Sequence, residues 1–200
     1  MIWQAEEASG IFERLGDLVQ QAECLVNLAS LLMQDEQLDA AEETALRAMD
    51  LLPEEGEQFQ VFHSRRVLGM IYQSKGEMKK AVFHLETALD IASALHSVED
   101  LFWAHYNLTE IFFDQGRLTD AQTHLRHAKS FAANGIYLLA CTSFRQASLW
   151  YKQDMFGEAK SEALAALDVF EKLGSTDNAE LTRRLLEQID AQWPDQPGDP

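Results

Sequence analysis

The sequence predicts an all-α fold, a solenoid of about ten helices in antiparallel pairs with no strands. Three of the four prolines lie in the last seven residues, which leaves Pro53 as the one helix breaker in the body of the chain. Apolar residues recur at helical spacing, as at Ala81, Leu85, Ala88 and Ile91. The pattern also repeats along the chain, which is the signature of stacked helical units.

The repeat begins with Leu28, Leu68 and Leu108, which stand 40 residues apart, and a fourth copy begins at Gln146, 38 residues further on. Small residues follow in the same register in every copy. These alanine columns are Ala41, Ala81, Ala121 and Ala159, then Ala48, Ala88, Ala128 and Ala166. Alanine in register predicts helices that cross closely, since a larger side chain would push them apart.

Large and turn-forming residues complete each copy. Tyr72, Phe112 and Trp150 stand at equivalent positions and are expected to fill the space between neighbouring helices. Gly76 and Gly116 follow the first helix of their copies, where a left-handed residue ends a helix at low cost. The expected helices are 1–14, 17–34, 38–52, 58–75, 78–96, 98–115, 118–133, 137–153, 156–172 and 177–192.

This pattern resembles the tetratricopeptide repeat over about residues 5 to 190. The residues that carry the resemblance are Leu68-Gly69, Tyr72, Gly76, Ala81, Leu85 and Ala88, with Pro53 closing the first copy. The copies exceed the family's usual period of about 34 residues by about six, which suggests longer helices. The resemblance implies a right-handed superhelix that serves as a protein–protein interaction scaffold without cofactors.

The two ends of the chain are related to each other. Phe12 to Gly16 (FERLG) recurs as Phe170 to Gly174 (FEKLG). We therefore expect the chain to be cut from a longer protein, or alternatively to begin with a natural cap. The expected solenoid over 1–192 divides into a trailing half-repeat at 1–16, repeats at 17–56, 57–96, 97–135 and 136–174, and a closing helix at 175–192, before a flexible tail at 193–200.

The closing helix has an expected start of its own. Asp177 is predicted to cap it, with Glu180 reaching back in a capping-box arrangement.

The net charge of −17 argues against nucleic acid and anionic membranes as partners, because both are bound through clustered Lys and Arg. Simple solubility explains the charge, and a basic or mixed-charge protein partner is the sharper alternative. Cys24 and Cys141 form no disulfide framework, and no secretory signal or membrane-length apolar run is visible. The cytoplasm is the expected compartment.

By the resemblance, residues of each first helix line a concave groove. The matching positions include Glu23, Val26, Asn27 and Ser30 in the first copy and His63, Arg66 and Val67 in the second. Aromatic and arginine side chains dominate binding hot spots. The candidate groove residues are therefore Arg66, Trp103, Tyr106, Asn107, Phe113, Phe144, Arg145 and Tyr151. The alternative is that several of them pack between helices, above all Phe113 and Phe144.

Some tetratricopeptide domains clamp a terminal carboxylate with Lys, Asn and Arg. Arg66, Asn107 and Arg145 resemble that clamp, but Met70 and Cys141 depart from it. Without its full set of donors a carboxylate site loses much of its binding energy, which counts against this role.

No catalytic, cofactor or metal site is predicted. The chain has no Gly-rich phosphate loop, no G-x-S-x-G elbow and no H-E-x-x-H motif. His124 and His127 have the spacing of a metal pair, but no third ligand is evident. His124 matches His84 one repeat earlier, which suggests a solvated position on a second helix.

A second resemblance concerns the context of the repeats. Ala40 to Glu43, Leu101 to Trp103, Trp150-Tyr151 and Ala159 to Ala163 look like the repeat tails of fungal receptors that carry an NB-ARC domain. This implies a sensor segment of a larger signalling protein. Two alternatives stay open: weak self-association through an open N-terminal end, and an autoinhibitory lid within the same receptor.

Overall fold

The computed structural model describes residues 2–52, 58–132 and 135–193. These residues form helices and connecting turns without any strand, so the all-α prediction is confirmed. The helices are α1 (Ile2–Leu15), α2 (Leu18–Gln34), α3 (Leu38–Leu51), α4 (Gln58–Ser74), α5 (Met78–Leu95), α6 (Val98–Asp114), α7 (Leu118–Phe131), α8 (Ile136–Tyr151), α9 (Phe156–Lys172) and α10 (Thr176–Gln192). Pro53 and most of the expected tail lie outside the described residues.

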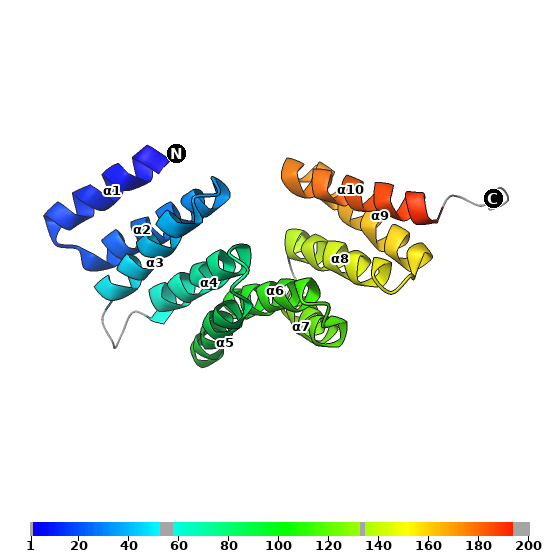
Figure 1. Ribbon diagram of the computed structural model, residues 1–200, viewed down its shortest axis with the longest axis horizontal. Helices are drawn as coiled ribbons and strands as arrows, with labels where there is room; N and C mark the ends of the chain where they lie inside the picture. The colour runs from blue at the N-terminus through cyan, green and yellow to red at the C-terminus, as the bar shows by residue number, and fades with distance from the viewer. Residues whose placement is uncertain (1, 53–57, 133–134, 194–200) are drawn as a thin grey trace. The chain divides into compact units, whose positions relative to one another are not determined.

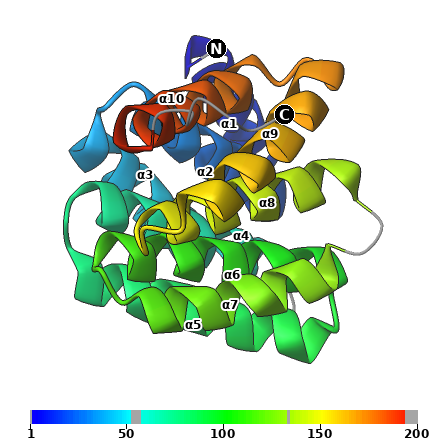
Figure 2. The same cartoon turned by 90° about the vertical axis from the view of Figure 1, so that its right-hand side faces the viewer.

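The chain divides into two compact units, of which unit 1 ends at Ile111 and unit 2 begins at Phe112. In unit 1, helices α1 to α5 pack in sequence order, each against the next. In unit 2, α7 packs on α8, α8 on α9 and α9 on α10 (Figures 1 and 2). The predicted stacking of successive helices is therefore confirmed within each unit, while the exact division into repeats stays a prediction.

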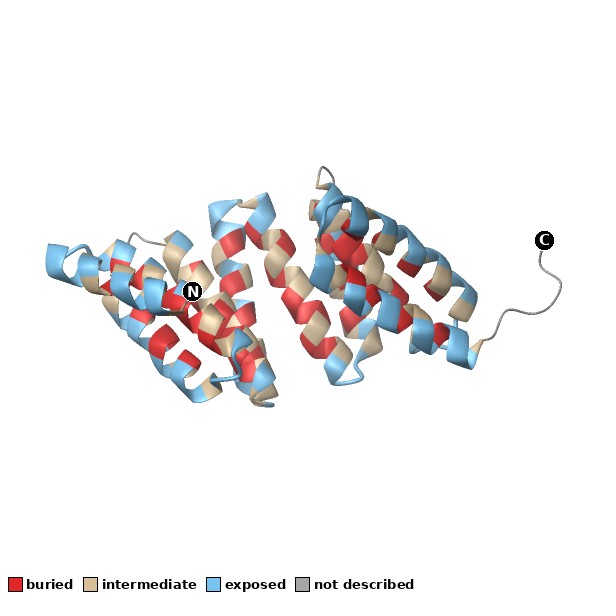
Figure 3. Cartoon of the chain, turned by 90° about the horizontal axis from the view of Figure 1, so that it is seen from above, coloured by how far each residue is buried: buried red, intermediate tan, exposed pale blue. Residues whose placement is uncertain are grey.

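The alanine columns form the contact surfaces between helices. All eight alanines of the two columns are buried, none exposing more than 1% of its surface. Figure 3 shows that the buried positions lie between packed helices, and that the exposed positions face outward. A methyl group lets two helix backbones approach closely, which is why the sequence keeps this residue in register.

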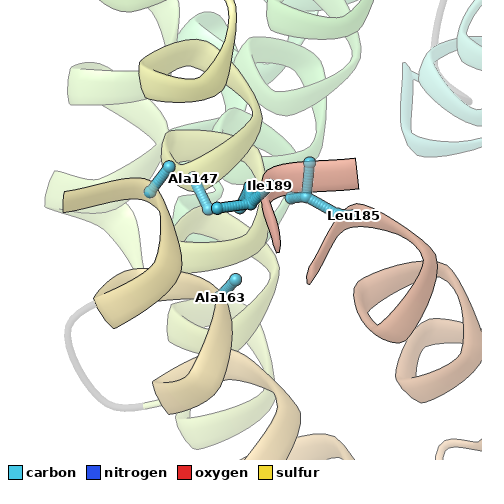
Figure 4. Packing of buried hydrophobic residues seen from close by; sticks show 5 residues of the cluster. Ala147, Ala163, Leu185 and Ile189 are labelled. Carbon is cyan, nitrogen blue, oxygen red and sulfur yellow. The ribbon is translucent and has the colours of Figure 1, made fainter. Parts of the chain in front are cut away.

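The two units use different pairs of residues at the equivalent contact between a first and a second helix. In unit 1, Gly69 on α4 faces Leu85 on α5, and a Cβ atom added to Gly69 would lie 2.6 Å from Leu85 Cγ. In unit 2, the equivalent residues 78 positions later are Ala147 on α8 and Ala163 on α9. These two alanines share a buried cluster with Leu185 and Ile189 of α10 (Figure 4).

The turns after the first helices use the left-handed backbone that was predicted. Gly76 and Gly116 have φ values of 75° and 69°. Glu36 and Asp154, at the matching positions of the first and fourth copies, adopt the same conformation with φ of 60° although each carries a side chain. The turn geometry is thus a property of the repeat, and glycine is the residue that adopts it without strain.

Two local predictions are wrong. Helix α10 begins at Thr176 with Ser175 as its N-cap, so Asp177 lies inside the first turn rather than capping it. The left-handed Gly174 (φ 68°) turns the chain so sharply that the Ser175 carbonyl already accepts a hydrogen bond from the Ala179 amide. His84 is half-buried rather than solvated, because its ring stacks on Tyr72 at 5.2 Å.

His124 repeats this arrangement in unit 2, where its ring lies 5.2 Å from that of Phe112. The second-helix histidine position therefore packs against the large residue of the first helix in both units.

Candidate functional site

The predicted groove residues are distributed over both units. Unit 1 holds Arg66 on α4 and Trp103, Tyr106 and Asn107 on α6. Unit 2 holds the remaining four, Phe113, Phe144, Arg145 and Tyr151. Seven of the eight are half-buried, a state that suits both packing and binding, whereas Asn107 is buried.

Unit 1 contains two adjoining pockets between the first helices of successive repeat copies, which are α2, α4 and α6. The α2–α4 pocket has a volume of about 180 Å³, and the α4–α6 pocket one of about 470 Å³. Phe59, His63 and Arg66 on α4 line both pockets. The wall facing them in the α2–α4 pocket is Glu23, Val26, Asn27 and Ser30. These are first-helix positions that the repeat pattern assigned to the groove, so the structure brings them together with Arg66.

Arg66 stands at the centre of this site. Its guanidinium lies 5.9 Å from the centre of the Trp103 ring, and its Nη1 contacts the Met70 sulfur at 3.7 Å. Burial lowers the pKa of Arg66, and the charge of Asp100 opposes that shift. The buried Nε atom has no acceptor among the described residues. A buried guanidinium N–H without an acceptor is costly, so Arg66 retains hydrogen-bonding capacity for a ligand.

Asp100 is the second buried charge of the α4–α6 pocket. It exposes only 4% of its surface, and no described residue donates a hydrogen bond to its Oδ2 atom. The residue lies in the first turn of α6, where the helix dipole favours a negative charge. The dipole explains why a carboxylate is tolerated at this position, but it supplies no donor to the unpartnered oxygen.

Histidine and aromatic rings form the rest of the α4–α6 pocket. Burial lowers the pKa of His63, with a further contribution from the charge of Arg66, so its ring is neutral at neutral pH. Phe59 exposes half of its surface and contacts the His63 ring edge-on at 4.4 Å. Trp103 packs edge-on against Phe102 at 5.0 Å and Tyr106 at 6.0 Å. The pocket therefore combines fixed aromatic surface with buried charge.

Asn107 occupies a different environment from its predicted neighbours. It exposes 4% of its surface, and its amide nitrogen has no acceptor among the described residues.

In unit 2, the predicted residues contact one another and the core. The Arg145 guanidinium lies 5.3 Å from the Phe113 ring and 5.5 Å from the Phe144 ring. Phe144 and Tyr151 pack against the buried cluster of α8, α9 and α10. Phe144 therefore packs between helices over part of its surface, as the alternative interpretation expected.

Sequence reasoning missed Phe59, Glu99 and Asp100. Asp100 precedes Trp103 by three residues and Phe59 precedes His63 by four, so each lies one helical turn before a recognised groove position. Extending the groove pattern by one turn would have found them. Asp100 and Glu99 instead look like ordinary acidic residues at a helix start.

Two other kinds of feature were considered in the described residues, a metal site and a membrane-spanning helix. No three histidine, cysteine or carboxylate side chains of the described residues gather as a metal site would require. None of the described helices combines the length and apolar character of a membrane span.

The likeness to a known family lies in the α4–α7 segment. Residues 60–134 match the tetratricopeptide repeat. The match contains Arg66, Asp100 and Trp103 and supports the resemblance drawn from Leu68-Gly69, Tyr72 and Gly76. No curated protein matches the chain.

Solved structures share the tetratricopeptide-like fold at low sequence identity. BtubC (BKLC) from P. vanneervenii superposes with a TM-score of 0.71 at 18% identity, covering 100% of this chain and 93% of that one. A Rap protein complexed with competence and sporulation factor gives 0.69 at 16% identity over 96% of this chain and 58% of its own. MamA protein gives 0.54 at 14% identity, with 99% and 98% covered. At these identities the likeness establishes the helical repeat fold alone.

Proposed function

We propose that the chain is a cytoplasmic protein-interaction scaffold, without catalytic activity, that holds a peptide or partner protein in the two pockets of unit 1. The observation that carries the proposal is the pair of adjoining pockets around Arg66, whose walls combine aromatic rings with buried, incompletely satisfied charged groups. Native proteins pair almost all buried polar atoms, so such atoms at a pocket point to a ligand that completes them. Trp and Arg are also the side chains most enriched at binding hot spots.

Two further facts support this role. Tetratricopeptide repeats are generally non-catalytic scaffolds, and residues 60–134 that match them contain most of the α4–α6 pocket. A Rap protein of the same fold was crystallised complexed with competence and sporulation factor. In unit 2, Phe113, Phe144, Arg145 and Tyr151 remain proposed contributors to the binding surface.

The test is selection from a random peptide library displayed on phage, followed by calorimetric titration of the selected peptides. We expect Trp103→Ala to weaken binding by about tenfold or more, as hot-spot truncations do, while the far-ultraviolet circular dichroism stays helical. Phe83→Ala is the matched control, because Phe83 is an aromatic residue with 59% exposure on α5 and lines neither pocket. Equal affinity for wild type and Trp103→Ala would refute the proposal.

The wider context is proposed on sequence resemblance. The likeness to repeat tails of fungal NB-ARC receptors supports a sensor segment of a larger signalling protein, in which flanking domains would cover the pockets until a partner displaces them. Peptide binding by a longer chain that includes the upstream residues tests this arrangement. Full affinity in the longer chain would argue against autoinhibition.

Self-association is a second candidate, favoured by the exposed apolar residues of α1 and the start of α2. Trp3 exposes 67% of its surface, Leu15 71% and Leu18 51%. Exposed apolar side chains of this size can form a contact surface between two copies. Light scattering over a range of concentrations tests it: a mass that rises with concentration and is restored to the monomer value by Leu15→Lys would support a contact between two copies.

A further inference from the structure

We propose that the α4–α6 pocket of unit 1 binds a cationic side chain of the partner, an arginine or lysine whose charged group donates a hydrogen bond to Asp100. The inference rests on the proposed function and adds the chemical class of the residue that is recognised. It depends on the hydrogen-bonding state of Asp100, on the balance of charge in the pocket and on the aromatic lining.

Asp100 exposes only 4% of its surface, and its buried Oδ2 atom has no donor among the described residues. An ionised carboxylate that is removed from water without donors is strongly destabilised. The missing element is an N–H donor, and a positively charged donor forms the stronger bond with a carboxylate.

The charged residues that line the two pockets indicate the sign of the charge on the ligand. Glu23, Glu99 and Asp100 contribute three carboxylates against the single guanidinium of Arg66. His63 adds no charge at neutral pH, because burial lowers its pKa. Arg66 also already lies over the Trp103 ring. The surplus of carboxylates, together with the net charge of −17, attracts cations and repels an anionic ligand.

The aromatic lining suits the stem of the same side chain. Phe59 is half exposed at the pocket and Trp103 is half-buried beside it. Arginine and lysine carry methylene stems that pack on apolar surface while their charged ends remain polar, and both charges interact favourably with aromatic faces. A volume of about 470 Å³ is ample for one such side chain.

The experiment uses peptides selected from the random library and compares each with a variant in which one arginine is replaced by citrulline, or one lysine by norleucine. Asp100→Asn removes the charge and keeps the shape of the side chain. Asp90→Asn, at an exposed position of α5 in the same unit, changes the net charge equally and serves as the control.

We expect selected peptides to be enriched in arginine or lysine, and Asp100→Asn to weaken their binding by about tenfold, the usual effect of losing a charge-assisted hydrogen bond. Asp90→Asn should change the affinity by less than about twofold, as remote surface charges do. The neutral peptide should bind equally to wild type and to Asp100→Asn, because the interaction is then already lost.

Three results would overturn the inference: enrichment of acidic residues, no loss on neutralising the peptide, or equal losses in Asp100→Asn and Asp90→Asn. If such peptides still lose affinity with Trp103→Ala, the pocket binds a partner of another charge and the scaffold function stands. If Trp103→Ala has no effect either, the proposed function fails as well.

Discussion

The predicted groove residues of units 1 and 2 combine arginine with aromatic side chains in both units, but the two units use them differently. In unit 1, the Arg66 guanidinium lies 5.9 Å from the Trp103 ring beside a buried carboxylate and two pockets. In unit 2, the Arg145 guanidinium lies within 5.5 Å of the Phe113 and Phe144 rings, and Phe144 packs on the core. Arginine and aromatic residues thus do not define a binding site by themselves. The buried carboxylate and the space beside it distinguish unit 1.

The largest expected effect comes from the helix contact that unit 1 fills with Gly69 and Leu85 and unit 2 with Ala147 and Ala163. Leu85→Ala should lower the free energy of unfolding by about 2–5 kcal/mol, because a fully buried leucine leaves a cavity. Gly69→Ala should lower it by about 1–3 kcal/mol, because the new methyl group overlaps Leu85. The double variant gives unit 1 the alanine pair found in unit 2. Its loss of unfolding free energy should be smaller than the sum of the two single losses. Urea denaturation measures all three.

Gly10→Ala controls for the change of helix propensity. A Cβ atom there would lie 3.7 Å from the nearest atom, a side-chain nitrogen of Arg14, so we expect a gain of up to about 1 kcal/mol. Strictly additive effects of Gly69→Ala and Leu85→Ala would show that the two residues do not compensate each other.

The next effect separates packing in unit 2 from binding in unit 1. Phe144→Ala should reduce the free energy of unfolding by about 2 kcal/mol, less than for a fully buried phenylalanine, since its ring packs on the α8–α10 cluster while staying partly exposed. Trp103→Ala should cost about 1 kcal/mol and instead abolish most peptide binding. Unfolding and calorimetric titration of both variants give the comparison. A collapse of the helical signal in Trp103→Ala would identify Trp103 as a core residue.

The smallest effect is a pH dependence shared by both units. Burial, aided by the nearby Arg65 charge, lowers the pKa of His84 from 6.5 to about 4. Burial also lowers the pKa of His124, with His127 as the next contribution. As the pH falls below 6.5 the unfolded chain takes up the His84 proton first, so its contribution to stability is present above 6.5 and lost by about 4.

For a ring that is only half-buried we expect a loss on the order of 1 kcal/mol. Titration of the ring signals by nuclear magnetic resonance measures both pKa values directly. Arg65→Met should raise the pKa of His84, because the Arg65 Nη1 lies 3.2 Å from the His84 Nδ1. An ordinary pKa for His84 in the wild-type chain would contradict its burial against Tyr72.

The repeat made most of the fold predictable. Every predicted helix is present with ends within two residues, because Ala81 and its equivalents occur where helices must touch and Gly76 and Gly116 where they must end. The cap of α10 was predicted two residues late, since both Ser175 and Asp177 are good caps and the turn at Gly174 selects between them.

The site was less predictable because it depends on burial. Arg66 and Trp103 follow from their register, and the structure places both at the α4–α6 pocket. Asp100 does not, because an acidic residue in the first turn of a helix is ordinary, and its burial is a result of tertiary packing. Asn107 shares a register with the exposed Asn27 and with the buried Val67, and it is itself buried. Register assigns a face to a residue, but its exposure follows from the neighbouring helices.

The most direct test of a binding site in unit 1 is to titrate the isotope-labelled chain with a library-selected peptide and follow assigned resonances. We predict saturable shifts of the Trp103 indole, the His63 ring and the backbone amides around Asp100. Shifts confined to Phe113, Phe144 and Tyr151 of unit 2, or to the exposed apolar residues of α1, would contradict the account.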